Sequence, residues 1–318
     1  MAFFEVSSAK KTTDLKSEYD VIIIGGGPAG ITASIYAIQA GLEPLVIEKA
    51  LEGGQMNNTD KIENWPGFSS ISGVDLSEKM AEHAQDHNVK ITNAEVVDVK
   101  PGKMKTVILD NGKEIKARVL IIATGSNPKK LGVPGEEKYS GKGISYCATC
   151  DGHFFRDKHV AVVGGGNSAL DEALYLAKIV KKITVVQNLP DLTADKMLQK
   201  RIRETGITDF IYNTIVKEVK GNDKLDKLLL KNVKTDEETE LDVDGAFVFI
   251  GMNPNTKFLK EKVELNDYGY IITNDHCETN IKGIYSVGDV REKEVRQIVT
   301  AAADGAIALL DASKRYFQ

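Results

Sequence analysis

Two hydrophobic runs in this chain are each followed by a cluster of glycines and then by a helical pattern. The first run is Val21–Ile24, inside YDVIIIGGGPAGITASIYAIQAG at residues 19–41, and the apolar segment PLVIEK at 44–49 follows it. Unbroken β-branched runs are typical of strands that are buried on both faces of a parallel sheet. The pattern therefore predicts a strand, a helix that ends at Gly41, and a second parallel strand.

The glycines between the first strand and its helix have a spacing with a chemical meaning. Gly25, Gly27 and Gly30 form a G-x-G-x-x-G motif, and Glu48 ends the next strand. In a dinucleotide-binding βαβ unit the glycines allow the tight turn, the approach of the pyrophosphate and the packing of the helix, while the acid binds a ribose. Together with the strand order, this motif predicts a dinucleotide site.

A second unit of the same kind lies in HVAVVGGGNSALDEALYLAK at residues 159–178, which is followed by the apolar segment KKITVV at 181–186. Its motif positions are taken by Gly164, Gly166 and Ala169. Two such units imply two nucleotide-type domains. A strand and turn in ARVLIIATGSNP, at 117–128, separate them, and GIYSVGDV and RQIVTAAADGAIALL follow the second unit. By spacing alone, these last two segments predict only a turn after a strand and an amphipathic helix.

Length and composition indicate a globular enzyme of about two domains. The chain has 318 residues, of which 42% are hydrophobic and 27% charged, and a net charge of −5. Such a charge gives no broad positive field, so we expect no nucleic-acid partner. The first twenty residues are polar, and no uncharged run approaches the ~20 apolar residues of a membrane span. We therefore expect a cytoplasmic protein that does not enter a membrane.

Several motifs occur in one order along nearly the whole chain: both glycine units, GGQ at 53–55, ENWPGF at 63–68, ATG at 123–125, CATCDG at 147–152 and GIYSVGDV at 283–290. In this combination the chain closely resembles the low-molecular-weight thioredoxin reductases. The resemblance implies an α/β fold with two Rossmann-like, three-layer domains, the second inserted into the first. It implies an FAD-binding domain over 1–126 and 253–318, a nucleotide-binding-like domain over 127–252 that carries the cysteine pair, and a homodimer.

The same resemblance assigns residues to FAD. Gly25, Gly27, Gly30 and Glu48 are expected at the ADP half, and Asp289 with the 296–298 segment at the ribityl chain and flavin. The full set of expected FAD-binding residues is Gly25, Gly27, Pro28, Ala29, Gly30, Glu48, Lys49, Gly54, Gln55, Asn64, Ala123, Thr124, Gly125, Gly288, Asp289, Arg296, Gln297 and Ile298.

Cys147 and Cys150, in SYCATCDGHFF at 145–155, are two of only three cysteines. A zinc site would need a second pair of ligands, but Cys277 stands alone beside His276, and His153 and His159 belong to no cluster. We therefore expect no metal. A purely structural disulfide across so short a loop would constrain little of the unfolded chain. A redox couple fits best.

The resemblance gives the members of this motif separate roles. It places Cys150 nearer the flavin and Cys147 as the more exposed sulfur. Asp151 matches the family's acid-base residue, and a carboxylate beside the sulfurs is useful because disulfide reduction must also handle protons. A cap of a helix or turn is the alternative for Asp151. Cys277, outside any motif, is interpreted as structural.

The chain departs from the family after its second glycine unit. Gln187 has the offset from Gly164 that Glu48 has from Gly25, so the acid that would favour NADH is missing. Members that use NADPH carry H-R-R-x-x-x-R here, whereas this chain has QNLPDLT at 187–193. The 2′-phosphate of NADPH thus loses its charge-assisted contacts. Residues left for a second nucleotide are Gly164, Gly166, Asn167, Ser168 and Ala169.

The use of NAD(P)H is therefore doubtful, and three hypotheses for the electron donor follow. In the first, NADH binds weakly through Gln187 or Asn188. In the second, the second glycine unit is only a scaffold, and reduced ferredoxin or another non-nicotinamide donor reduces the flavin. In the third, NADPH binds through contacts that the family motif does not include. Cations that could replace the motif are Lys181, Lys182, Lys196 and Arg201. We favour the second. An acidic ferredoxin would need a basic face, for which KIVKK at 178–182 is a candidate, although lysine runs usually face solvent.

The predicted function is the transfer of two electrons from a donor to FAD, then to the Cys147–Cys150 disulfide, then to the disulfide of thioredoxin or a thioredoxin-like protein. A peroxiredoxin-like or dedicated disulfide partner is the enzymatic alternative, and a flavin-bound redox sensor is the non-enzymatic one. One sulfur pair that serves a buried flavin and then a protein must move between them. The segments 126–130 and 251–255 are the predicted hinges.

Overall fold

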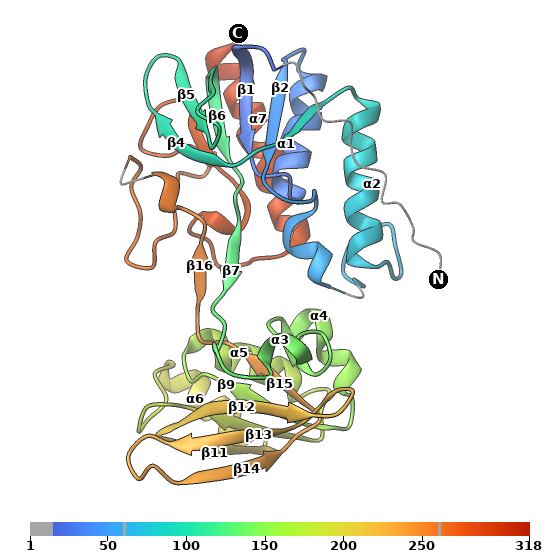
Figure 1. Ribbon diagram of the computed structural model, residues 1–318, viewed down its shortest axis with the longest axis vertical. Coiled ribbons are helices and arrows are strands. Elements are labelled where there is room, and N and C mark those ends of the chain that lie inside the picture. The colour runs from blue at the N-terminus through green and yellow to red at the C-terminus, as the bar shows by residue number, and fades with distance from the viewer. Residues whose placement is uncertain (1–14, 60–61, 260–261) are drawn as a thin grey trace. The chain divides into compact units, whose positions relative to one another are not determined.

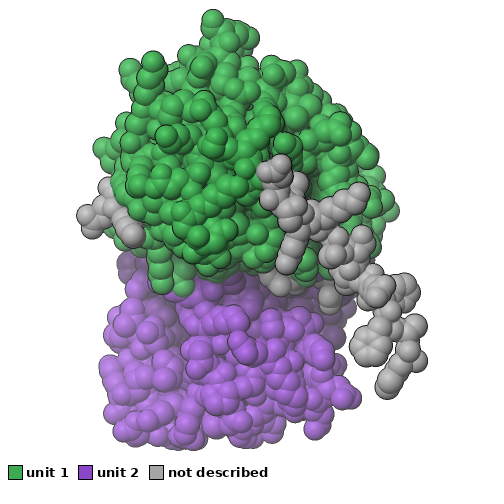
Figure 2. Space-filling view, turned by 45° about the horizontal axis from the view of Figure 1, so that its top comes forward, with its two compact units in different colours: residues 1–58, 64–127, 253–318 green, residues 59–63, 128–252 purple. Residues whose placement is uncertain are grey.

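The computed structural model describes residues 15–59, 62–259 and 262–318, and its ribbon is shown in Figure 1. The chain divides into two compact units, each described here by itself (Figure 2). Unit 1 comprises residues 1–58, 64–127 and 253–318, and unit 2 comprises residues 59–63 and 128–252. Unit 2 is thus largely an insertion into the sequence of unit 1. The insertion begins after residue 127 and ends at residue 252, whereas the expected domain began after residue 126 and ended at residue 252.

Unit 1 is built on a seven-stranded sheet in the order β3-β2-β1-β6-β5-β4, with β17 also paired to β6. The strands β3, β2, β1, β6 and β17 run parallel, whereas β4, β5 and β6 pair antiparallel. Their bounds are β1 Glu18–Ile24, β2 Pro44–Glu48, β3 Lys90–Asn93, β4 Val96–Lys100, β5 Lys105–Leu109, β6 Glu114–Ile122 and β17 Ile284–Ser286. The helices are α1 Pro28–Gln39, α2 Gly73–Asp86 and α7 Ile298–Tyr316, with short turns η1 Gly54–Asn58, η3 Lys257–Leu259 and η4 Gly288–Val290.

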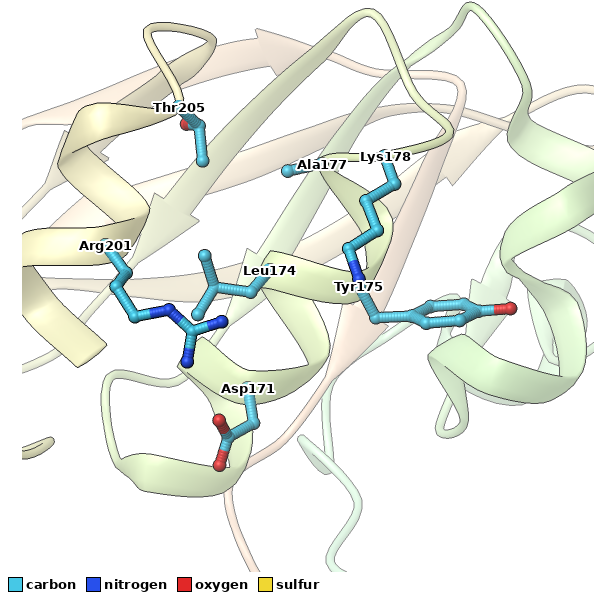
Figure 3. A pocket seen from close by; sticks show the side chains of 7 residues that line it. All are labelled: Asp171, Leu174, Tyr175, Ala177, Lys178, Arg201 and Thr205. Carbon is cyan, nitrogen blue, oxygen red and sulfur yellow. The ribbon is translucent and has the colours of Figure 1, made fainter. Parts of the chain in front are cut away.

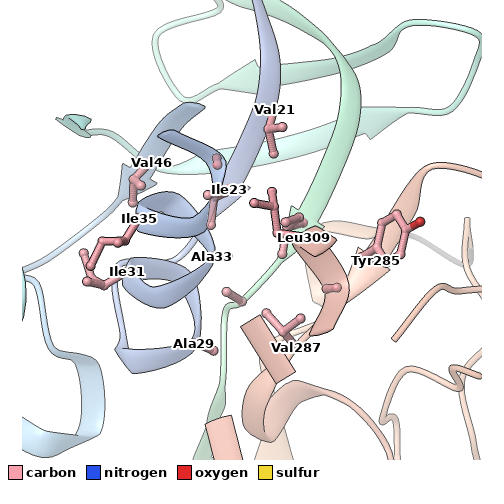
Figure 4. Packing of buried hydrophobic residues seen from close by; sticks show 14 of the residues in the cluster. Val21, Ile23, Ala29, Ile31, Ala33, Ile35, Val46, Tyr285, Val287 and Leu309 are labelled. Atoms are coloured by element: carbon pink, nitrogen blue, oxygen red, sulfur yellow. The ribbon is translucent and has the colours of Figure 1, made fainter. Parts of the chain in front are cut away.

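The β-branched run of β1 is buried on both faces, as its sequence predicts. Val21 and Ile23 join one apolar cluster with residues of α1 and α7, part of which Figure 4 shows. Ile22 and Ile24 join a second cluster on the other face. At Gly305 of α7 a side chain would lie 2.2 Å from the carbonyl oxygen of Ala29, so glycine permits the close contact of α7 with α1. The helices, the sheet and the second apolar layer form three layers.

Unit 2 has a five-stranded, fully parallel sheet in the order β11-β10-β9-β15-β8. Helices α5 and α6 pack on one face, and a three-stranded antiparallel sheet, β12-β13-β14, packs on the other. The parallel strands are β8 Ile144–Ser145, β9 His159–Val163, β10 Lys182–Val186, β11 Thr208–Ile211 and β15 Gly245–Val248. The antiparallel strands are β12 Thr214–Gly221, β13 Leu225–Asn232 and β14 Glu238–Asp242. The helices are α3 Glu136–Tyr139, α4 Ala148–Asp151, α5 Asn167–Leu176 and α6 Lys196–Glu204, with the turn η2 Gly152–Phe155.

The chain passes between the units at two short strands, β7 Ser126–Pro128 and β16 Met252–Pro254, which pair with each other. Both strands lie inside the two segments predicted as hinges. The predicted fold class, α/β with two Rossmann-like domains, is confirmed by the two parallel sheets with their strand-glycine-helix order. No helix in the described residues is long and apolar enough to span a bilayer.

Candidate active site

The first glycine turn sits where the carboxyl ends of β1 and β6 lie side by side. Gly25 has a φ of +110°, and a side chain there would lie 2.3 Å from the Ala123 carbonyl oxygen. A side chain at Gly30 would lie 2.0 Å from the carbonyl oxygen of Gly25. At Gly27, by contrast, no atom stands within 4 Å of that position, so the space above the turn is open. The open space at Gly27 therefore leaves room for a phosphate at the N-terminus of α1.

Glu48 is fixed beside this turn at the end of β2. One carboxylate oxygen accepts the N–H of Gly26 at 2.7 Å, and the other accepts the N–H of Ala50 at 2.9 Å. The strand, the turn and the acid therefore come together at one edge of the sheet, as the glycine motif predicts. Pro28 and Ala29 begin α1 next to them, and the Lys49 ammonium is directed to Glu95, at 3.8 Å.

The ATG turn is tied to the segment that returns from unit 2. The Thr124 hydroxyl donates to the Asn255 carbonyl at 2.9 Å, and the Asn255 amide donates to the Thr124 carbonyl at 2.8 Å. Gly125, with a φ of +64°, accepts the N–H of Asn255. These hydrogen bonds join the segment that leads into unit 2 to the segment that returns from it, and they hold the ATG turn in place.

Two amide side chains expected to bind FAD also find partners within unit 1. Gln55, next to Gly54 in η1, donates to the Asn127 side chain at 2.5 Å. Asn64 donates to the Gln297 side chain at 3.0 Å. Gln297 also caps α7, which begins at Ile298. The structure thus brings the expected residues at 64 and 297 into contact, although they are far apart in sequence.

Asp289 and Arg296 have buried polar atoms with no hydrogen-bond partner in the described part of the chain: Asp289 Oδ1 and Arg296 Nε. Burial raises the pKa of the Asp289 carboxyl, and the nearby cations Lys293 and Arg296 partly offset this. The guanidinium of Arg296 lies over the Tyr270 ring, 4.2 Å from its centre. An unpaired acceptor and an unpaired donor near the end of the sheet fit the hydroxyl and ring atoms of a polar cofactor such as FAD.

No motif in the sequence indicates the role of Asp304, which lies in α7. Its carboxylate accepts the N–H of Gly288 at 3.0 Å and pairs with Arg291 at 3.1 Å and Lys293 at 2.8 Å. Gly288, expected to bind FAD, therefore uses its own N–H within the protein. Only the spatial cluster reveals this network, because its members are spread over seventeen positions from 288 to 304.

Cys147 and Cys150 form a disulfide whose Cα atoms are 5.3 Å apart. Cys147 is the N-cap residue of α4, and its sulfur accepts the N–H of Cys150 at 3.2 Å. The next residue, Ala148, is fully buried. The pair is therefore held at the N-terminal end of a short helix, where backbone dipoles stabilise a thiolate.

Asp151 is linked back to the strand before the cysteines by a residue that the sequence analysis missed. The hydroxyl of Ser145 in β8 donates to the Asp151 carboxylate at 2.6 Å and accepts the N–H of Cys147 at 3.1 Å. Asp151 is also the N-cap residue of η2, where its side chain makes no capping hydrogen bond. The single hydroxyl of Ser145 therefore contacts both the Asp151 carboxylate and the Cys147 backbone.

The second glycine turn has a backbone similar to that of the first, but the side chains around it differ. Gly164 has a φ of +126°, and a side chain there would lie 2.3 Å from the Phe249 carbonyl oxygen. Gln187 is buried; it donates to the Asp191 carbonyl at 3.2 Å and accepts the Asn188 N–H at 3.2 Å. Its side chain packs on Gly165, where an added side chain would lie 2.6 Å away.

The expected second-nucleotide residues Ser168 and Ala169 follow in the first turn of α5, while Asn167 exchanges two hydrogen bonds with Asp195, at 2.9 and 2.8 Å. The loop from 187 to 195 contains no lysine or arginine and two aspartates. Its Thr193 and Ala194 N–H groups bind the Gly165 carbonyl. The loop thus has two acidic residues and no cation.

The cations considered as substitutes lie in other surroundings. Lys182 pairs with Asp209 at 2.9 Å. Arg201 lines an open groove of about 410 Å³ between α5 and α6, where Figure 3 shows it with Asp171, Tyr175 and Lys178. Lys178 thus places one end of the 178–182 run on this groove.

The remaining thiol and the histidines support no further redox or metal site. Cys277 is buried, and burial raises its pKa to about 11, which keeps it a protonated thiol. His159 binds the Thr184 hydroxyl at 2.9 Å, and burial lowers its pKa. Within residues 15–59, 62–259 and 262–318, no three His, Cys, Asp or Glu side chains are grouped to hold a metal ion.

Comparison with known proteins agrees with this arrangement. The model of the family "Pyridine nucleotide-disulphide oxidoreductase" matches residues 19–305. The chain is 47% identical to thioredoxin reductase of Bacillus subtilis over 291 residues, which cover 91% of this chain and 92% of that protein. It is 42% identical to the "34.2 kDa protein in rubredoxin operon" of Clostridium pasteurianum, covering 94% and 97%. The crystal structure of thioredoxin reductase from Streptococcus pyogenes has a TM-score of 0.88 at 46% identity, covering 94% and 98%.

Proposed function

The chain belongs to the pyridine nucleotide-disulphide oxidoreductase family and, within it, to the thioredoxin reductases, and from that membership we propose that it reduces the disulfide of thioredoxin or a thioredoxin-like protein. The observation that carries the proposal is the Cys147–Cys150 disulfide at the start of α4, with Asp151 held beside it by Ser145. These groups can accept two electrons and a proton at one place.

FAD, when bound, supplies the electron pair. The first glycine turn would bind its pyrophosphate, Glu48 its ribose hydroxyls, and Asp289 and Arg296 the polar atoms toward the flavin end. The open space at Gly27 and the unpaired Asp289 and Arg296 atoms support this assignment. Burial raises the pKa of the Asp289 carboxyl, and Lys293 and Arg296 partly offset this rise.

The two cysteines and Asp151 perform the rest of the reaction. Reduction breaks the S–S bond, and the sulfurs take two electrons; one sulfur takes a proton and the other remains a thiolate or takes a second. By the family resemblance Cys150 would be the sulfur nearer the flavin and Cys147 the more exposed one, and one of the two attacks the partner's disulfide. Asp151 delivers or receives the proton, because Ser145 fixes its carboxylate beside the same turn. Movement about the β7 and β16 segments serves the two half-reactions in turn.

The favoured donor is reduced ferredoxin or another non-nicotinamide reductant. The loop at 187–195 supports this choice because it has no cation for a 2′-phosphate and places Asp191 and Asp195 there. Gln187 is committed to its own backbone neighbours, which also weakens the NADH alternative.

An anaerobic titration of the flavin tests the donor. The holoenzyme is mixed in turn with NADPH, NADH and reduced ferredoxin, and bleaching of the flavin absorbance is followed. We expect bleaching by ferredoxin and not by micromolar NADPH. Rapid bleaching by NADPH would refute the interpretation of the 187–195 loop. A panel of oxidised thioredoxin-like and peroxiredoxin-like proteins then separates the two partner classes, while no turnover with any of them would favour the redox sensor.

A homodimer is supported by the outer face of α7. Val299, Ile307 and Leu310 are 44%, 42% and 47% exposed, and with Ala303 their spacing places them on one stripe of the helix. The opposite face of α7 packs in the core of unit 1. Exposed aliphatic side chains in such a stripe are typical of a subunit interface. The double variant Ile307→Glu and Leu310→Glu should sediment as a monomer, and an unchanged mass would refute this interface.

A further inference from the structure

We propose that Glu172 is a positioning residue for the cysteine pair: its carboxylate holds the first turn of α4 and supplies a negative charge that keeps Cys147 protonated to higher pH. The inference deepens the proposed redox function of Cys147 and Cys150 and rests on it. Glu172 lies in the second glycine unit, in a helix that the nucleotide motif would assign to phosphate binding. In this chain the same helix acts on the sulfurs.

The contact that carries the proposal joins α5 to α4. Glu172 Oε2 accepts the N–H of Ala148 at 3.1 Å, and the N–H of Thr149 also interacts with the carboxylate. Ala148 is fully buried in the same apolar cluster as Ala173 and Leu176 of α5. Because both helices are anchored in that cluster, the carboxylate has a fixed position at the N-terminal end of α4.

This position affects the acidity of Cys147 in two ways that act in the same direction. Free N–H groups at a helix N-terminus stabilise a thiolate on the cap residue. The Cys147 sulfur receives the N–H of Cys150, but the N–H of Ala148 is given to Glu172. The carboxylate also places a like charge near a thiolate, which disfavours its formation. Both effects raise the pKa of the Cys147 thiol.

The surroundings of Glu172 explain how its charge is controlled. Burial raises the pKa of the Glu172 carboxyl; the N–H groups of Ala148 and Thr149 partly offset this, and neighbouring Asp171 adds to it. The other titratable groups on the elements packed around α4 are Cys150 (once reduced) and Asp151 in α4, His153 in η2, which lies 3.5 Å from Glu63, and Tyr175 in α5.

Alkylation of the reduced cysteines as a function of pH tests the proposal directly. The holoenzyme is reduced anaerobically with dithiothreitol, which becomes its cyclic disulfide, and is then freed of reductant and treated with iodoacetamide. Trypsin cleavage after Lys142 and Arg156 yields one peptide with both cysteines, while Cys277 lies in another. Fragmentation of that peptide by mass spectrometry reports the modification of Cys147 separately.

Glu172→Gln removes the charge but keeps the shape and an acceptor for the Ala148 N–H. We expect the midpoint of Cys147 alkylation to fall by about one pH unit relative to the wild type, as for removal of a nearby like charge. The matched control is Asp171→Asn, which removes the same charge one residue earlier from an exposed position of α5. Its midpoint should stay near that of the wild type. Equal midpoints for Glu172→Gln and the wild type would overturn the proposal, as would equal shifts in both variants.

Two further measurements keep the test decisive. If Glu172→Gln does not fold, Glu172→Asp replaces it: this variant keeps the charge but shortens the side chain by one methylene, which withdraws the carboxylate from the Ala148 N–H, so the Cys147 midpoint should fall by less than one pH unit. An unchanged midpoint in that variant would overturn the proposal. The alkylation requires neither an electron donor nor thioredoxin. A failure to reduce thioredoxin would therefore count against the proposed function alone, and an unchanged Cys147 midpoint in an active enzyme would count against Glu172 alone.

Discussion

The two glycine units have nearly the same backbone and different chemistry. Gly25 and Gly164 both have positive φ, and both pass close to a carbonyl of the neighbouring strand. In the first unit the next strand ends in Glu48, whose carboxylate reaches back to the turn. In the second it is followed by Gln187, whose amide binds its own loop. The glycine turn therefore specifies a place for a pyrophosphate, while the residues after the next strand decide which nucleotide is bound.

The helices of the two units also differ. Helix α1 carries no charged residue and is buried between the sheet and α7, whereas α5 carries Asp171 and Glu172. The first helix has only to pack and to present its N-terminus. The second contacts the redox-active turn through Glu172. A helix that begins at a phosphate-binding motif can thus serve the sulfur chemistry as well.

The largest expected effect separates the flavin function of unit 1 from the sulfur function of unit 2. Cys150→Ser should lower thioredoxin reduction by ~10³-fold or more, because a single thiol cannot complete the two-electron exchange. Donor-driven bleaching of the flavin should persist, since no residue of the first glycine unit changes. The buried Cys277→Ala is the control and should retain turnover. Full activity of Cys150→Ser would exclude the pair as the electron carrier.

A smaller effect should follow from placing the residue of the second motif into the first. At the third motif position the chain has Gly30 in one unit and Ala169 in the other. A Cβ at Gly30 would lie 2.0 Å from a backbone oxygen, and overpacking costs about 1–3 kcal/mol. If the distortion falls on the binding turn, Gly30→Ala should weaken FAD binding by roughly 5- to 150-fold. The reverse change, Ala169→Gly, should leave the flavin content of the purified protein unchanged.

Restoring cations to the second unit should make it more like an NADPH site. Asn188, Leu189 and Thr193 are exposed, so each can be replaced by arginine while the buried Gln187 is kept. A charge-assisted hydrogen bond is worth about 1.5–3 kcal/mol, so even one restored contact should tighten NADPH binding by about tenfold or more.

The measurement is the NADPH concentration that bleaches the flavin anaerobically. Arginines at the exposed positions Met197, Ile215 and Val233 of unit 2 supply a charge-matched control. Equal gains in both triple variants would mean that net charge, and not the loop, governs binding. No gain in the first variant would mean that the second unit lacks more than the basic motif.

The smallest effect concerns the buried acid that distinguishes α5 from α1. Burial raises the Glu172 pKa above its ordinary 4.5, so ionisation opposes folding. Relative to the Glu172→Gln variant, the stability of the wild type should be highest below pH 4.5 and should be lost as the pH rises through the higher folded-state pKa. Thermal unfolding of both proteins at a series of pH values gives this difference, in which all other titrating groups cancel. A difference independent of pH would contradict the shift.

Local sequence is sufficient to specify the architecture and the chemical class of this protein. The run Val21–Ile24 predicts a doubly buried strand, because only a central parallel strand can bury β-branched residues on both faces. The glycine spacing predicts the turns, since a Cβ added at Gly25 or Gly30 would lie 2.3 or 2.0 Å from a carbonyl oxygen, which leaves no room for a side chain. The CATCDG segment predicts a redox pair because its residues are neighbours in the chain.

The distant groups that act on the site are identified only in the folded chain. Ser145, Glu172 and Asp304 lie in the quoted segments at positions to which no motif gives a role, yet they hold Asp151, the first turn of α4 and the N–H of Gly288. A side chain's partner across two helices depends on how those helices pack, and an exposed acid and a buried one look alike in a sequence. The same reason explains Gln187: its absence of charge is visible in the sequence, but its commitment to its own loop is a property of the folded chain.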